Sequence, residues 1–72
     1  MLHNFTIDYQ NFYLTITENG QVVFSKDFYY EPVNDRIRGV YDAIFEYTDI
    51  PEERLEEVLE QVLNFGYISY DL

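Results

Sequence analysis

The residues best suited to chemistry are carboxylates that recur along the C-terminal half of the chain. Five glutamates fall between positions 52 and 60: Glu52, Glu53, Glu56, Glu57 and Glu60. Carboxylates can bind hard cations, transfer protons where a hydrophobic pocket shifts their pKa values, or attract basic protein surfaces. Residues 42 to 72 contain nine acidic residues and one basic residue, Arg54. The other residues of the chain decide among these three uses.

Catalytic and metal-binding patterns do not accompany the carboxylates. The EF-hand loop with its central glycine and terminal glutamate is absent, and the chain has no cysteine. His3 is the only histidine, and we expect it at the surface. Ser25 and Ser69 are expected on exposed strand faces, and the isolated glycines form no phosphate-binding loop. We therefore expect a non-enzymatic protein with no catalytic residue, no cofactor and no dedicated metal site.

The composition of the chain limits the kinds of molecule that it can bind. A net charge of −10 on 72 residues repels nucleic acid and attracts basic protein surfaces. Eight tyrosines and six phenylalanines distinguish the chain from a disordered acidic tail. The lack of cysteine is consistent with a reducing cytoplasm. Residues 1–20 have no basic n-region and no unbroken apolar run, so we expect neither a signal peptide nor a membrane span there. We expect one cytoplasmic domain over residues 1–72 that binds neither nucleic acid nor membrane directly.

The first 30 residues predict three strands. Apolar residues alternate with polar ones on both sides of Gln10 and Asn11, the residues of a predicted two-residue turn that pairs Ile7 with Leu14. At the next turn, the apolar pattern favours a three-residue loop over residues 18–20 with a bulge, pairing Ile16 with Val22. The third strand is predicted to run over residues 21–29.

The remaining residues predict two helices and a last strand. Asn34 is the predicted N-cap of the first helix, and Asp49 that of the second, with Pro51 in its first turn. Gly39 either weakens the first helix or allows a neighbour to approach closely. Gly66 is the predicted left-handed C-cap. Residues 67–72 alternate again and are expected to form an edge strand.

The predicted fold is therefore α+β: a three-stranded antiparallel meander, two helices on one face, and a short C-terminal strand, in the order βββααβ. The other face of the sheet is expected to be polar and solvated. The predicted core comprises Phe5, Ile7, Phe12, Leu14, Ile16, Val22 and Phe24 from the strands, and Ile37, Val40, Ile44, Leu55, Val58, Leu59 and Val62 from the helices.

Two interpretations of the glutamate-rich helix stay open. Eight residue steps span about 12 Å of helix, so the charge spacing is comparable with that of phosphates along one DNA strand. Such a helix could occupy a basic groove, yet a solvated helix face that maintains solubility has the same pattern. Like charges four residues apart are unfavourable, which favours a binding role. The predicted partner-binding residues are Asp42, Glu46, Tyr47, Asp49, Glu53, Glu56, Glu57, Glu60 and Tyr67.

Tyrosines support a second hypothesis from a different class. Five of them fall outside the apolar pattern of the predicted strands and helices: Tyr13, Tyr29, Tyr30, Tyr47 and Tyr67. Tyrosines of this kind either cover a small core or form a protein interface. Because a domain of this size is marginally stable alone, a tyrosine-rich surface and a sheet edge could form a homodimer. The acidic residues would then mainly limit further aggregation.

Two resemblances bear on function. Residues 63–68 resemble the end of the recognition helix and the first wing strand of winged-helix proteins. Glutamates at positions 53, 56, 57 and 60 would stand where a DNA reader meets phosphates, so this resemblance implies a protein-binding module. In overall profile, the small, acidic, aromatic-rich and cysteine-free chain resembles proteins encoded by phages and prophages. That group includes DNA mimics, so the resemblance implies an inhibitor of nucleic-acid-binding machinery.

Overall fold

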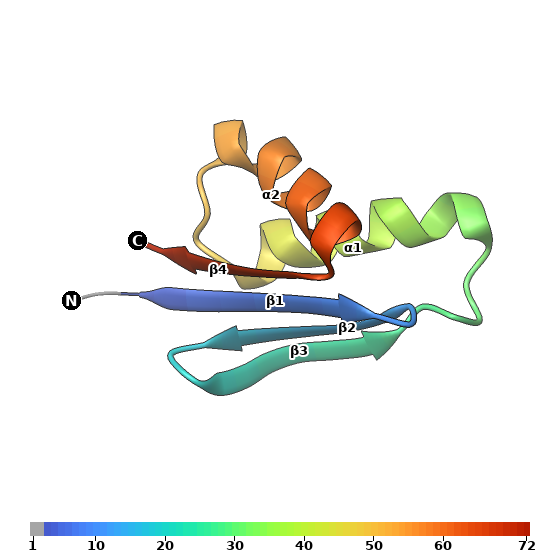
Figure 1. Ribbon diagram of the computed structural model, residues 1–72, viewed down its shortest axis with the longest axis horizontal. Helices are drawn as coiled ribbons and strands as arrows, with labels where there is room; N and C mark the ends of the chain where they lie inside the picture. The colour runs from blue at the N-terminus through green and yellow to red at the C-terminus, as the bar shows by residue number, and fades with distance from the viewer. Residues whose placement is uncertain (1–2) are drawn as a thin grey trace.

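The computed structural model describes residues 3–72 and has the predicted βββααβ order (Figure 1). Its elements are β1 (Asn4–Gln10), β2 (Tyr13–Glu18), β3 (Gln21–Asp27), α1 (Val33–Tyr47), α2 (Glu52–Phe65) and β4 (Tyr67–Asp71). The four strands form one antiparallel sheet in the order β3-β2-β1-β4. The α+β architecture and the edge position of the last strand are thus confirmed. Among residues 3–72, none of the helices is both long and apolar enough to span a membrane.

Both helices lie on the same side of the sheet (Figure 1). Helix α1 contacts β2 and β3, whereas α2 contacts β1 and β4. The opposite face of the sheet carries polar residues in register, with Thr6 facing Thr17 and Thr15 facing Ser25. The hydroxyl groups of Thr6 and Thr17 are hydrogen-bonded to each other. The sheet is therefore apolar toward the helices and polar on its other face, as expected for an antiparallel sheet covered on one side.

The first turn lies one residue further along the chain than predicted, which shifts the register of β1 against β2 by two residues. Its central residues are Asn11 and Phe12, with φ angles of 52° and 67°, and Ile7 pairs with Ile16 rather than with Leu14. Positive φ at both central residues matches the twist of a tight hairpin. Because the register differs by two residues, the apolar side chains of the strands stay on the core face. The predicted turn at Gln10 and Asn11 was wrong, but the predicted faces of the two strands were right.

The second turn is tighter than predicted. Asn19 and Gly20 form a two-residue turn with positive φ angles of 52° and 85°. The register then shifts between Ile16 and Thr17, so that Ile16 pairs with Phe24 while Thr17 pairs with Val22. A bulge is present, as predicted, but it lies within β3 and not in the loop. It restores the apolar face after the turn, and β3 ends at Asp27, two residues earlier than predicted.

Prolines, not the predicted polar caps, precede both helices. Pro32 and Pro51 have extended ψ angles of 143° and 141°, and each helix begins at the following residue. The predicted N-caps Asn34 and Asp49 were therefore wrong. Thr48 instead links the end of α1 to the connection after it, because its hydroxyl donates to the Ile44 carbonyl at 2.6 Å and accepts from the Ile50 backbone N–H at 3.4 Å. At the other end of α2, the left-handed Gly66 with φ of 76° confirms the predicted C-cap.

The core differs from prediction at a few positions. Three predicted core residues, Phe12, Val22 and Ile37, are exposed by 40%, 61% and 53%. Phe12 lies in the turn, Val22 precedes the bulge, and Ile37 faces a groove between the helices. Three residues missing from the prediction are buried: Phe28, Ala43 and Ile50. The Phe28 ring packs against Gly39, which shows that this glycine permits a close approach.

Candidate protein-binding surface

The glutamates of α2 form one exposed surface, here called the acidic face: Glu52, Glu53, Glu56, Glu57 and Glu60. At about 100° of rotation per residue, they cover an arc of roughly 140° on the helix. Leu55, Val58 and Val62 lie on the opposite side of the helix and are buried. The acidic face therefore points away from the sheet, because the same helix turns its apolar stripe toward the core.

Basic residues neutralise little of the acidic face. In residues 3–72, Arg54 pairs with Glu57 at 3.2 Å and Lys26 pairs with Glu31 at 2.9 Å. Arg36 uses its guanidinium for the backbone carbonyls of Phe28 and Tyr29. Glu57 is thus the one glutamate of the acidic face with a basic partner in this part of the chain. The other four remain available for an external cation or a basic protein.

A shallow apolar groove lies between the two helices. It has a volume of about 670 Å³ and is lined by Val33, Asn34, Ile37, Arg38, Tyr41, Asp42 and Leu59. Val33 and Ile37 contribute much of its apolar surface, with exposed fractions of 69% and 53%. Asn34, Arg38 and Asp42 form a more polar row along α1, one helical turn apart from each other. The groove is thus lined by both apolar and charged residues.

The acidic face adjoins this groove. On an ideal helix, Glu56 and Glu60 lie within about 100° of Leu59, the groove residue that α2 contributes. Asp42 lines the groove from α1, and Glu46 lies exposed one turn further along that helix. The structure therefore gathers most of the predicted acidic residues, Glu53 and Glu57 included, on the helix layer. Apolar contact area and negative charge occur side by side there.

The other predicted binding residues lie apart from the groove. Tyr47 packs against Phe24, with ring centres 4.7 Å apart. Tyr67 lies in β4 opposite Asp8, on the sheet face that the helices leave open. Asp49 belongs to the connection between the helices. The predicted set therefore does not form one site: its glutamates and Asp42 lie on the helix layer, and Tyr67 lies on the other side of the sheet.

An aromatic patch marks the end of the molecule near the first turn. It consists of Phe12, Tyr29 and Tyr30, which are exposed by 40%, 59% and 86%. The ring of Tyr29 lies 6.3 Å from that of Phe12 and 5.2 Å from that of Tyr30. Tyr9 contacts the inner side of the patch through Phe12. Burial raises the pKa of Tyr9 above its usual value, and the nearby charge of Arg36 offsets part of this effect.

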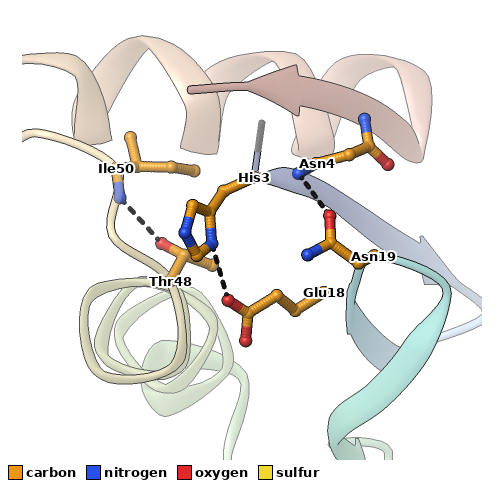
Figure 2. A network of polar contacts seen from close by, with 6 residues as sticks. All are labelled: His3, Asn4, Glu18, Asn19, Thr48 and Ile50. Carbon is orange, nitrogen blue, oxygen red and sulfur yellow. Dashed lines mark hydrogen bonds and ion pairs between the residues drawn. The ribbon is translucent and has the colours of Figure 1, made fainter. Parts of the chain in front are cut away.

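A cluster of His3, Glu18 and Asp49 was missed by the sequence analysis. The Nδ1 atom of His3 lies 3.0 Å from Oε1 of Glu18, and Asp49 completes the group. Figure 2 shows the His3 ring turned toward Glu18, beside the connection that carries Thr48 and Ile50. His3 was expected to be a surface residue because it lies near the start of the chain, and Glu18 and Asp49 reach it from segments distant in the sequence.

Comparison of the chain with models of protein families, with curated proteins and with solved structures found no match. The winged-helix resemblance has a limited structural counterpart. Residues 63–65 end α2 and residues 67–68 begin a strand, as the local likeness implies. That strand pairs with β1, however, at the edge of a four-stranded sheet. The function must therefore be argued from the surface itself.

Proposed function

We propose that the chain is a non-enzymatic protein-binding module whose helix layer engages a basic protein surface, such as the groove of a nucleic-acid-binding protein. The observation that carries this proposal is the acidic face, of which Glu57 alone has a basic partner among residues 3–72, beside an exposed apolar groove. Charge on such a surface steers and orients the partner, whereas apolar residues such as Ile37 supply the contact that slows dissociation. In this proposal the chain acts in the cytoplasm. It inhibits its partner by occupying the partner's basic nucleic-acid-binding groove, as the resemblance to phage-encoded DNA mimics implies.

A purely solubilising acidic face would have a different setting. Solubility requires charge, but it does not require an apolar groove at the border of the charged surface. Exposed apolar residues at such a border are typical of a protein interface with an apolar centre and a polar rim. The position of Ile37 and Leu59 next to Glu56 and Glu60 therefore favours binding over solubility alone.

Fluorescence anisotropy with two labelled helical peptides of equal positive charge tests this function. One peptide carries a lysine face and a leucine face, and the other has glutamine in place of leucine. We expect tighter binding of the leucine-containing peptide and a steep loss of affinity as salt is raised. Glu56→Lys should weaken binding at least about tenfold, whereas Asp8→Lys, which makes the same charge change on the open sheet face, should weaken it far less. Equal losses in both variants, or a complex insensitive to salt, would contradict the proposal.

The aromatic patch favours a second candidate function, the assembly of a homodimer. Tyr30 is exposed by 86%, and the patch joins Tyr29 and Phe12 in one aromatic surface. Light scattering after size-exclusion chromatography, over a concentration series at low and high salt, tests this function. We expect a dimer that Tyr30→Ser dissociates if the patch is an interface. A monomer at every concentration would rule the homodimer out.

A further inference from the structure

Three segments that are distant in the sequence bring one potential metal ligand each to the same place. His3 immediately precedes β1, Glu18 is the last residue of β2, and Asp49 lies between α1 and α2. The imidazole nitrogen and the carboxylate oxygens lie within 4.8 Å of one another. The closest approach is the 3.0 Å contact between Nδ1 of His3 and Oε1 of Glu18 (Figure 2).

Hydrogen bonds and a ring contact hold the three segments. Asn4 and Asn19 exchange hydrogen bonds of 2.9 Å and 2.7 Å, which fixes the end of the hairpin beside Glu18. The His3 ring stacks near Phe5, with ring centres 6.2 Å apart. Asp49 lies between two buried residues, Thr48 and Ile50, whose backbone is tied to the end of α1 through the Thr48 hydroxyl. The ligand atoms therefore belong to anchored segments.

The donor set selects a class of metal. One imidazole nitrogen with two carboxylates suits zinc and neighbouring divalent transition ions, whereas magnesium and calcium prefer oxygen donors alone. Tetrahedral zinc with ligand bonds of about 2.0–2.2 Å separates its ligands by roughly 3.3 Å. The 3.0 Å distance between His3 and Glu18 is close to this separation. Asp49 is exposed, so its side chain is not held by packing in the core. The ligand atoms lie within 4.8 Å of one another, so binding of the ion would draw the Asp49 carboxylate toward the other two ligands.

We propose that His3, Glu18 and Asp49 form a binding site for zinc or a neighbouring divalent transition-metal ion. Three protein ligands leave one position for water or for a group from a partner. The ion would join the start of β1, the end of β2 and the connection between the helices. Such a cross-link stabilises a small domain, and this chain has no cysteine to provide one by other means. A dication is also favoured by the net charge of −10.

Isothermal titration of the tag-free chain with zinc chloride tests the site. We expect one ion per chain and a rise in the thermal unfolding midpoint. His3→Gln, Glu18→Gln and Asp49→Asn should each weaken binding at least about tenfold. The matched control is Asp8→Asn, which removes one carboxylate charge outside the cluster, on the open sheet face, and should leave affinity unchanged. Circular dichroism checks that each variant is folded.

Nuclear magnetic resonance supplies a second readout. Because His3 is the only histidine of the chain, its imidazole signals are unambiguous. We expect the Nδ1 resonance to shift in step with the calorimetric titration, and an excess of magnesium to leave it in place. Unchanged imidazole signals, several equivalent ions per chain, or equal losses in Asp8→Asn and Asp49→Asn would show adventitious binding to carboxylates and would overturn the proposal.

Discussion

The guanidinium of Arg36 lies over the ring of Phe12, with the Cζ atom 4.3 Å from the ring centre. The same guanidinium donates hydrogen bonds to the carbonyls of Phe28 at 3.0 Å and Tyr29 at 2.8 Å. Phe12 is the second central residue of the first turn and has a φ of 67°, a value that is uncommon for a bulky residue. Arg36 therefore joins α1, the β3–α1 connection and a strained turn.

At position 12 a glycine variant should be more stable than an alanine variant, although glycine usually destabilises a folded chain relative to alanine. Phe12→Ala loses the contact with Arg36 and keeps the unfavourable φ, so we expect it to lower the free energy of unfolding by about 1–2 kcal/mol. Phe12→Gly loses the same contact but removes the strain, so it should be about 1 kcal/mol more stable than Phe12→Ala. Urea denaturation of both variants measures the difference. A glycine variant less stable than the alanine variant would show that the turn has another conformation.

Gly39→Ala should destabilise the protein although alanine favours a helix. An added methyl group would overlap the buried ring of Phe28, so the expected loss of stability is about 1 kcal/mol or more. The double variant Phe28→Leu with Gly39→Ala isolates the cause. In the Phe28→Leu background we expect Gly39→Ala to be neutral or stabilising. An equal cost in both backgrounds would mean that Phe28 is not the obstacle.

Two left-handed glycines provide a matched comparison. Gly20 and Gly66 have φ angles of 85° and 76°, but a side chain at Gly20 meets open space whereas one at Gly66 overlaps the Gln10 amide. Gly20→Ala should cost about 1–2 kcal/mol through φ alone. Gly66→Ala should cost more, because the Gln10 side chain that donates to the Gly66 carbonyl at 3.1 Å must also move. Chemical denaturation ranks the two variants, and equal costs would contradict the contact.

The stability of the protein should fall at alkaline pH in part through Tyr9. Burial raises the pKa of its hydroxyl in the folded state, so the unfolded chain releases this proton at a lower pH than the folded one. The contribution of the Tyr9 hydroxyl to the free energy of unfolding is therefore complete below the ordinary tyrosine pKa. It is lost as pH rises through the pKa of Tyr9 in the folded state. We expect Tyr9→Phe to have a shallower decline in unfolding free energy above about pH 10. Identical pH profiles for variant and parent would contradict this assignment.

Relief of repulsion on the acidic face should stabilise α2. Glu56 has like charges four residues away on both sides, Glu52 and Glu60, so Glu56→Lys converts two repulsions into two attractions. We expect a gain of about 0.5–1 kcal/mol at low salt that decreases as salt is added. Thermal denaturation at two ionic strengths measures it. Because the same substitution should weaken binding of a basic partner, a gain in stability with a loss of affinity would indicate charge retained for function.

The sequence pattern predicted the elements well because period-two and helical spacing depend on local residues. It also placed Leu14 and Ile16 in the core despite a wrong register, since a shift of two residues preserves strand faces. Turn geometry was less predictable. Phe12 occupies a position where glycine is preferred, and only its tertiary contact with Arg36 accounts for it.

The functional residues were predictable in part. The exposure of the acidic face follows from helical spacing, and Glu56 and Glu60 lie where that spacing places them. The groove depends on how α1 crosses α2, which no periodicity specifies, and Ile37 was consequently assigned to the core. His3 meets Glu18 and Asp49 through three separate segments, so only the tertiary arrangement brings them together.

The place of β4 in the sheet has a consequence for folding. Asn4 donates to Ser69, a residue 65 positions away along the chain, whereas the hairpins of β1, β2 and β3 close through turns of two residues. Because loop closure over a long separation is slow, the meander should form before β4 docks. Until then β1 presents an unpaired edge to other copies of the chain. A net charge of −10 keeps such copies apart during this interval, so acidity protects the protein even before any partner is met.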